Sequence, residues 1–163
     1  MFDALTYSER RRALMQRIGA GVVLLLGHRD SPMNFRDNAY DFRQDGSFAY
    51  LCGLDQPGLA LVLDVDSGEE TLFADDADLD HEVWTGPVPR ATERATACGI
   101  ANAAPVAQLQ VRVAQARAQN RPIHVLPAYR AQTQIELQEL LGGAAPSAAL
   151  VQAVVALLSL IHI

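Results

Sequence analysis

The densest group of potential metal ligands in the sequence is a run of carboxylates followed by a His–Glu pair. It comprises Asp75, Asp76, Asp78, Asp80, His81 and Glu82. A helix–loop–helix calcium site would need a glycine at the sixth position of such a run and a glutamate at the twelfth, and both are missing. A zinc-binding helix would need a second histidine four residues after His81, where Thr85 stands. We therefore interpret the run as a solvated helix start, where the helix dipole favours carboxylates.

Other groups able to do chemistry are scattered along the chain. His28, His124 and His162 do not pair with another histidine or cysteine at metal-ligand spacing. A G-x-S-x-G motif is absent, so no serine nucleophile is indicated. The glycines at residues 19–21 precede an apolar run, which is the wrong order for a dinucleotide-binding loop. We therefore predict no catalytic residue, no metal ligand and no bound cofactor within this chain.

Residues 37–53 show a more unusual pattern, in which aromatic rings are interleaved with charged and amide side chains. These residues are Tyr40, Phe42, Arg43, Gln44, Asp45, Phe48 and Tyr50. Such a mixture is typical of a pocket wall or an interface rim. In the alternative interpretation, Arg43 pairs with Asp41 or Asp45 and only pins the loop. The residues alone leave both interpretations open.

Hydrophobic periodicity predicts the elements that would position this segment. A helix is expected over residues 7–18, capped by Ser8 and ended by Gly19. Further helices are expected over residues 106–119 and 133–141, and strands over residues 22–26, 47–52, 59–65, 70–74 and 123–126. Helices that alternate with strands predict an α/β fold with a mixed β-sheet flanked by helices. The polar stretch between the first two strands is a long loop, and such loops are often functional.

Composition narrows the class of protein. A chain of 163 residues, 50% of them apolar, suits one domain with a real core. A net charge of -6 argues against nucleic acid as a partner, and the one basic run, Arg10–Arg12, is expected to spread around a solvated helix. No apolar run is long enough to span a membrane. Cys52 and Cys98 are unpaired and the N-terminus has no signal-peptide pattern, so we expect a cytoplasmic protein.

Several motifs in the first half of the chain resemble a known family. The stretch D-N-A-Y-D-F-R-Q-D-G-S-F-A-Y-L at residues 37–51 is followed by C-G-L-x-x-P at residues 52–57 and by E-V-W-T-G at residues 82–86. With the helix and strand before them, these motifs resemble the N-terminal domain of Xaa-Pro aminopeptidases and prolidases, the creatinase-like metallopeptidases. The resemblance is specific from about residue 7 to residue 86 and continues as a looser pattern to about residue 157.

The resemblance implies a ribonuclease-H-like, aminopeptidase P N-terminal domain at residues 1–157, in a protein whose separate C-terminal "pita-bread" metallopeptidase domain is missing from this sequence. That missing domain would bind two manganese ions, and the present chain alone would be inactive. The whole protein would remove the N-terminal residue that precedes proline in a peptide substrate. The N-terminal domain would help to form a homo-oligomer and narrow access to the active site, often that of a neighbouring subunit.

The resemblance also implies roles for particular residues. Asp37 matches a family position near the amino end of the substrate, and Trp84 matches a ring that lines the pocket. Tyr40 and Arg43 are candidates for the loop or interface. A carboxylate can pair with a free ammonium group, and an indole offers a flat wall. The alternatives are that Trp84 only packs in the core and that Asp37 caps its own turn. Aminopeptidase and dipeptidase branches are not separated by these residues.

The last six residues fit the family poorly. Residues 158–163 read L-S-L-I-H-I, which resembles the translation of a sequencing adapter, so we expect the authentic sequence to stop near Leu157. The alternative is a short apolar strand. Two rival functions stay open: a stand-alone binding or oligomerisation module with the same fold and no peptidase activity, and an unrelated small α/β enzyme that uses Asp37, Arg43 or Asp45.

Overall fold

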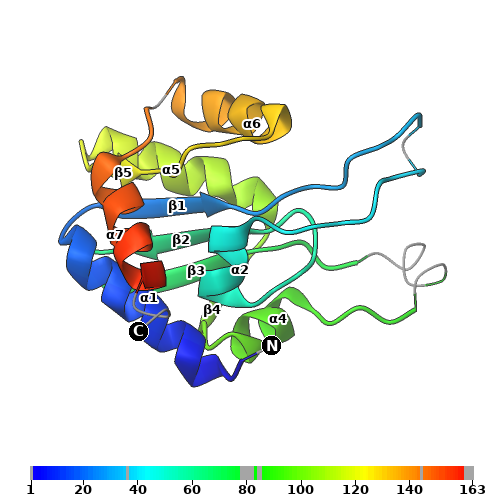
Figure 1. The fold of residues 1–163 in the computed structure, drawn as a ribbon, viewed down its shortest axis with the longest axis horizontal. Helices are drawn as coiled ribbons and strands as arrows, with labels where there is room; N and C mark the ends of the chain where they lie inside the picture. The colour runs from blue at the N-terminus through cyan, green and yellow to red at the C-terminus, as the bar shows by residue number, and fades with distance from the viewer. Residues whose placement is uncertain (1, 36, 78–82, 84–85, 144, 160–163) are drawn as a thin grey trace.

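A mixed β-sheet forms the centre of the computed structural model, which describes residues 2–35, 37–77, 83, 86–143 and 145–159. Within that part of the chain the sheet has the strand order β4-β3-β2-β1-β5 (Figure 1). The strands are β1 (Val22–Leu26), β2 (Ala60–Asp64), β3 (Glu69–Phe73), β4 (Asn102–Ala104) and β5 (Ile123–His124). The three central strands are antiparallel neighbours, whereas the outer strands β4 and β5 pair in parallel with β3 and β1, respectively.

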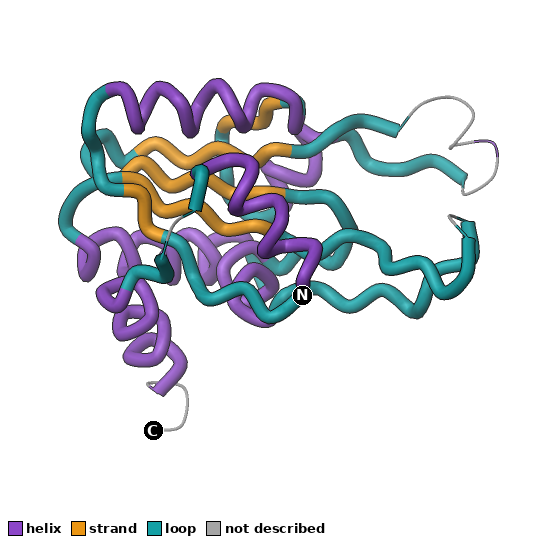
Figure 2. The backbone as a smooth tube through the Cα atoms, turned by 90° about the horizontal axis from the view of Figure 1, so that it is seen from above, coloured by secondary structure: helices purple, strands orange, loops and turns teal. Residues whose placement is uncertain are grey.

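Helices cover both faces of this sheet (Figure 2). One face packs against α1 (Ala4–Ile18), α2 (Gly46–Cys52), α4 (Ala91–Ala97) and α7 (Ala148–Ser159). The other packs against α5 (Leu109–Ala118), which follows the short 3-10 helix η1 (Val106–Gln108), and against α6 (Ala131–Leu141). Alternate residues of β1 and β2 pack into the hydrophobic cores on the two faces of the sheet. Because both faces are buried, the sequence of each strand is a nearly continuous apolar run. The predicted α/β fold is confirmed. No described helix is long and apolar enough to cross a bilayer.

One predicted strand is wrong, because residues 47–52 belong to helix α2. Asp45 accepts the backbone N–H of Phe48 at 2.9 Å and so caps the start of the helix. Gly53 ends it in the left-handed conformation, with φ at 69°. Phe48, Leu51 and Cys52 are buried together at helical spacing. The segment is therefore apolar on one side of a short helix.

The N-terminal helix starts earlier than predicted and has a different cap. Asp3, and not Ser8, caps α1 by accepting the backbone N–H of Thr6 at 2.8 Å. Gly19 ends the helix as expected.

The expectation that Arg10–Arg12 are solvated is wrong for Arg11, which is fully buried. Its guanidinium donates to Glu70 of β3 at 2.9 Å, to the carbonyl oxygen of Leu51 at 2.9 Å and to that of Gly99 at 3.2 Å. A single side chain thus joins α1 to β3 and to the C-terminal ends of α2 and α4.

Candidate functional site: two arms at one edge of the sheet

Two long segments leave the sheet at the same end of its central strands. Leu26, the last residue of β1, pairs with Ala60 at the start of β2, and Ala60 pairs with Phe73 at the end of β3. The segments after β1 and after β3 must therefore start side by side. Figures 1 and 2 show the described parts of both segments extending from the body in the same direction. We call residues 28–45 the first arm and residues 75–90 the second arm.

The first arm is a hairpin held by its own backbone. The N–H of Met33 donates to the carbonyl of Asn38 at 2.8 Å, and that of Tyr40 donates to the carbonyl of Ser31 at 2.9 Å. Met33, Phe35 and Tyr40 are each more than half exposed. The polar loop predicted from the sequence is thus a projecting hairpin that presents apolar side chains to its surroundings.

A buried amide fixes the root of the first arm. The side-chain oxygen of Gln44 accepts the N–H of His28 at 2.7 Å and that of Asp45 at 2.9 Å, and its nitrogen donates to the carbonyl of Gln56 at 2.8 Å. The ring of His28 lies 2.9 Å from the carbonyl oxygen of Arg43. Sequence reasoning grouped Gln44 with the residues of a pocket wall or interface rim and missed this role. The only sequence signal was a single glutamine near the end of a long polar loop, where a side-chain amide can join the two ends of the loop.

Helix α6 also contacts this root. Arg29 on the outgoing limb forms an ion pair with Glu136. Arg130, at the start of α6, lies with a guanidinium nitrogen 3.5 Å from the carbonyl oxygen of Arg43 on the returning limb. Both limbs of the first arm are therefore tied to the body of the domain.

The site residues predicted on the first arm do not form a single cluster. Asp37 lies in the exposed turn at the tip, and its carboxylate makes no hydrogen bond or ion pair with any described residue. Tyr40 is exposed on the returning limb, and the exposed Arg43 lies near the root. Within the described chain, Arg43 pairs with neither Asp41 nor Asp45. Trp84, the remaining predicted site residue, lies outside the described residues.

The predicted grouping of aromatic rings in residues 37–53 is wrong for the two rings that lie after the first arm, Phe48 and Tyr50. Phe48 is buried in the core. The guanidinium carbon of Arg10 instead lies over the ring of Tyr50, 4.1 Å from the ring centre. The prediction assumed a strand, in which alternate side chains share one face. Because α2 is a helix, Phe48 and Tyr50 do not share a face with Tyr40.

The first two carboxylates of the second arm accept hydrogen bonds from the first residues of α4 and η1. Asp76 accepts the N–H of Ala91, the first residue of α4, at 2.6 Å. Asp75 accepts the N–H of Val106, at the start of η1, at 2.9 Å. Both contacts place a negative charge at a helix N-terminus. The rest of the acidic run, residues 78–82, lies outside the described residues.

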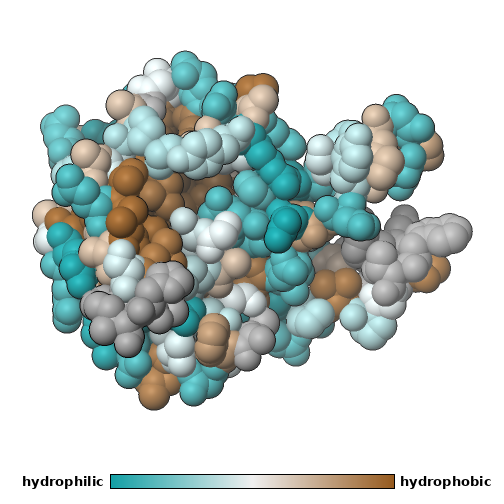
Figure 3. All heavy atoms as spheres, viewed as in Figure 1, coloured by the Kyte–Doolittle hydropathy of each residue, from teal (hydrophilic) through white to brown (hydrophobic). Residues whose placement is uncertain are grey.

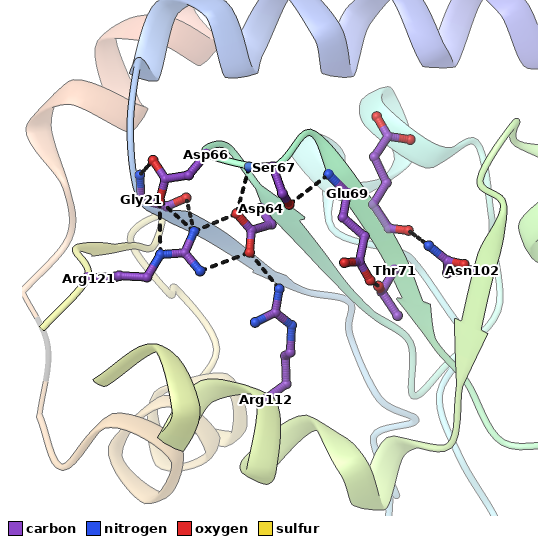
Figure 4. Close-up of polar contacts among 10 residues, drawn as sticks. Gly21, Asp64, Asp66, Ser67, Glu69, Thr71, Asn102, Arg112 and Arg121 are labelled. Atoms are coloured by element: carbon purple, nitrogen blue, oxygen red, sulfur yellow. Dashed lines mark hydrogen bonds and ion pairs between the residues drawn. The ribbon is translucent and has the colours of Figure 1, made fainter. Parts of the chain in front are cut away.

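The densest described ionic cluster lies at the opposite end of the central strands from the arms (Figure 4). Asp64 accepts hydrogen bonds from Arg121 at 2.9 Å and from Arg112 at 2.6 Å. These bonds, with that of Arg121 the strongest, hold the pKa of the Asp64 carboxyl well below its usual value. Asp66 accepts from Arg121 and from the N–H of Gly21 at 3.0 Å. Every acid in the cluster is already paired, so its role is structural.

Metal and thiol chemistry find no support in the described part of the chain. No group of three or more His, Cys, Asp or Glu residues there could hold a metal ion. Two manganese ions would therefore have no donor set among these residues. Cys52 and Cys98 are free and buried, and burial raises the pKa of both thiols. A buried, protonated thiol is a poor nucleophile.

The chain is similar to the N-terminal part of several known proteins. Residues 7–125 match the family described as "Aminopeptidase P, N-terminal domain". A protein of Aspergillus terreus named "Probable Xaa-Pro aminopeptidase" is 37% identical over 78 residues, which cover 48% of this chain and 16% of that protein. A protein of the same name from Ajellomyces dermatitidis is 34% identical over 86 residues, covering 53% of this chain and 17% of its own.

Solved structures share the fold. A variant of Escherichia coli aminopeptidase P superposes with a TM-score of 0.71 at 20% identity. The match covers 86% of this chain and 33% of the Escherichia coli chain. Pseudomonas aeruginosa aminopeptidase PepP gives a TM-score of 0.71 at 22% identity, covering 86% and 32%. The chain thus spans about a third of the solved structures and a smaller share of the curated relatives. The family match covers most of the chain, and the protein belongs to the aminopeptidase P N-terminal domain family.

Proposed function

We propose that this chain is the non-catalytic N-terminal domain of a metal-dependent Xaa-Pro aminopeptidase, and that its two arms shape the access of peptides to the catalytic site. The observation that carries the proposal is the pair of arms that leave one end of the central strands, one of them with an exposed carboxylate, Asp37, in the turn at its tip. The family membership supports it, because the relatives named above are called Xaa-Pro aminopeptidases. Among the described residues, no group of His, Cys, Asp or Glu side chains could hold the metal ions of such a peptidase.

The chemistry of the first arm suits the amino end of a peptide. A carboxylate with no partner among the described residues can bind an ammonium group in a charge-assisted hydrogen bond. Asp37 would supply that contact, and Trp84 on the second arm would supply an apolar wall. We propose that these side chains act in the pocket of the same subunit or of a neighbour in a homo-oligomer. The catalytic domain would bring the two manganese ions, and the protein would act in the cytoplasm.

The test compares two aspartates of the first arm in the whole protein. Asp37→Asn should raise the KM for a tripeptide with proline at its second position about tenfold, because a hydrogen bond to a charged group contributes roughly 1.5–3 kcal/mol. Asp41→Asn is the matched control, since Asp41 is an exposed aspartate of the same arm, and its KM should stay near that of the unmodified enzyme. Equal KM values for the two variants would refute the role of Asp37.

A stand-alone oligomerisation module is the alternative, and one observation favours it. Met33, Phe35 and Tyr40 present apolar surface on a projecting hairpin, which is suited to self-association. This alternative predicts a natural stop codon after Ile163 and a chain that oligomerises without hydrolysing peptides. Sedimentation of the 163-residue chain, together with an assay for release of the N-terminal residue, separates the two functions.

A further inference from the structure

A cavity of about 440 Å³ lies at the root of the first arm, between the sheet and the helices α5 and α6. Its walls come from the end of β1, the start of β2, the η1–α5 segment and α6. The apolar part of the wall includes Leu26, Val106, Leu109 and Leu140. The surface around the start of the first arm is otherwise largely hydrophilic in the view of Figure 3. An apolar hollow with a few polar groups is typical of a site for a small molecule.

Two opposite charges in direct contact line this cavity. Arg29 of the first arm forms an ion pair with Glu136 of α6, and both side chains belong to the cavity wall. The bond engages Nε of the guanidinium and Oε1 of the carboxylate. The two terminal nitrogens of Arg29 and Oε2 of Glu136 therefore have no partner among the described residues.

A second carboxylate lies on the same side of α6. Glu139 follows Glu136 by three residues, a spacing that makes two helical side chains neighbours. It is exposed and also lines the cavity. The polar part of the wall thus offers guanidinium donors next to two carboxylates. We call the cavity with Arg29, Glu136 and Glu139 the α6 cavity.

These groups complement a ligand whose own opposite charges are adjacent. A carboxylate can bind the terminal nitrogens of Arg29 in a charge-assisted, bidentate contact. An ammonium group attached to the same carbon then reaches the carboxylate of Glu136, because Glu136 touches Arg29. A free α-amino acid carries both charges on one carbon, whereas a peptide separates them by its backbone. An apolar side chain would lie in the apolar hollow, where its burial is favourable.

We propose that the α6 cavity binds a free α-amino acid with an apolar side chain. The bound ligand joins Arg29, on the outgoing limb of the first arm, to α6 in the body, and so stabilises the root of that arm. This binding does not rest on the proposed function. Under that function the residue released from the peptide is itself a free amino acid, so the reaction would supply ligands of this class.

Isothermal titration calorimetry of the 163-residue chain with L-leucine tests the site. A ligand of this size with both charges paired should bind with a Kd on the order of 1 mM or tighter. Isocaproate lacks the ammonium group and isoamylamine lacks the carboxylate, so each should bind at least about tenfold more weakly. Leucyl-leucine, in which the two charges are separated, should also bind more weakly than L-leucine.

Variants locate the binding. Glu139→Gln keeps the shape of the side chain and removes its charge, so the Kd for L-leucine should rise about tenfold. Glu9→Gln is the matched control, because Glu9 is an exposed glutamate of α1 on the other face of the sheet; its Kd should not change. Arg29→Gln should weaken L-leucine and isocaproate without weakening isoamylamine. Both Arg29 and Glu139 are exposed, so these variants should fold.

Three results would overturn the inference. L-leucine could give no binding at concentrations about tenfold above the expected Kd. Its binding could be unchanged in both E139Q and R29Q, which would place the ligand elsewhere. Isoamylamine could bind as tightly as L-leucine, which would make the cavity a site for cations and not for amino acids. None of these results changes the KM of Asp37→Asn, so this inference and the proposed function fail separately.

Discussion

Replacing Arg11 with alanine should destabilise the domain more than any substitution of an exposed arginine. The guanidinium is fully buried and donates to Glu70 at 2.9 Å and to the carbonyls of Leu51 and Gly99 at 2.9 and 3.2 Å. Removing one member of a buried ion pair costs about 3–5 kcal/mol, because the other member stays buried without compensation. Domains of this kind are stable by about 5–15 kcal/mol, so Arg11→Ala should remove a large part of the folding free energy.

The assay is urea denaturation of the 163-residue chain, followed by far-UV circular dichroism. Arg12→Ala is the matched control, since Arg12 is the next residue of the same helix and is exposed; its free energy of unfolding should change by less than about 0.5 kcal/mol. The double variant Arg11→Met with Glu70→Leu should recover much of the loss, because an apolar pair of similar volume replaces a buried ion pair well. If Arg11→Ala costs no more than Arg12→Ala, the reasoning about this contact is refuted.

Two further predictions concern the stability of the same chain. The Asp64 carboxyl has a lowered pKa because of Arg121 and Arg112, so its stabilising contribution is complete above the pKa of an unfolded aspartate, about 3.9, and is lost as the pH falls through the lower native value. Urea midpoints of wild type and Asp64→Asn should therefore differ at pH 7, and the difference should shrink as the pH falls below about 4; a difference independent of pH would contradict this. Asp45→Ala removes the cap of α2 and should cost about 1 kcal/mol in the same assay, whereas an unchanged midpoint would show that the cap contributes nothing.

The strands β1, β2, β3 and β5 were predictable from the sequence because their signal is local, whereas the three-residue strand β4 was not predicted. Residues 22–26 form a continuous apolar run bounded by glycines, and β1 occupies the same residues. The short apolar run of α2 was ambiguous, because a few apolar residues fit either a strand or one side of a helix. Its conformation follows from the cap at Asp45 and the left-handed turn at Gly53.

Burial of Arg11 could not be predicted, because its partners are distant in the sequence. Glu70 and Gly99 are 59 and 88 residues away along the chain, and nothing in the pattern of three consecutive arginines distinguishes the middle one. In the candidate site, too, the features with a local sequence signal were predictable and those that depend on distant contacts were not. The long loop that contains Asp37 was visible as a polar stretch, but the fixing of its root by Gln44 depends on contacts that only the folded domain supplies.

The measurement that tests the central claim most directly is the sequence of the source DNA across the codon for Leu157 and beyond that for Ile163. Our account predicts that the whole reading frame also encodes a second domain with the ligands of a two-metal site. A stop codon directly after Ile163 in independent reads would contradict it and would leave a stand-alone domain whose partner has yet to be found.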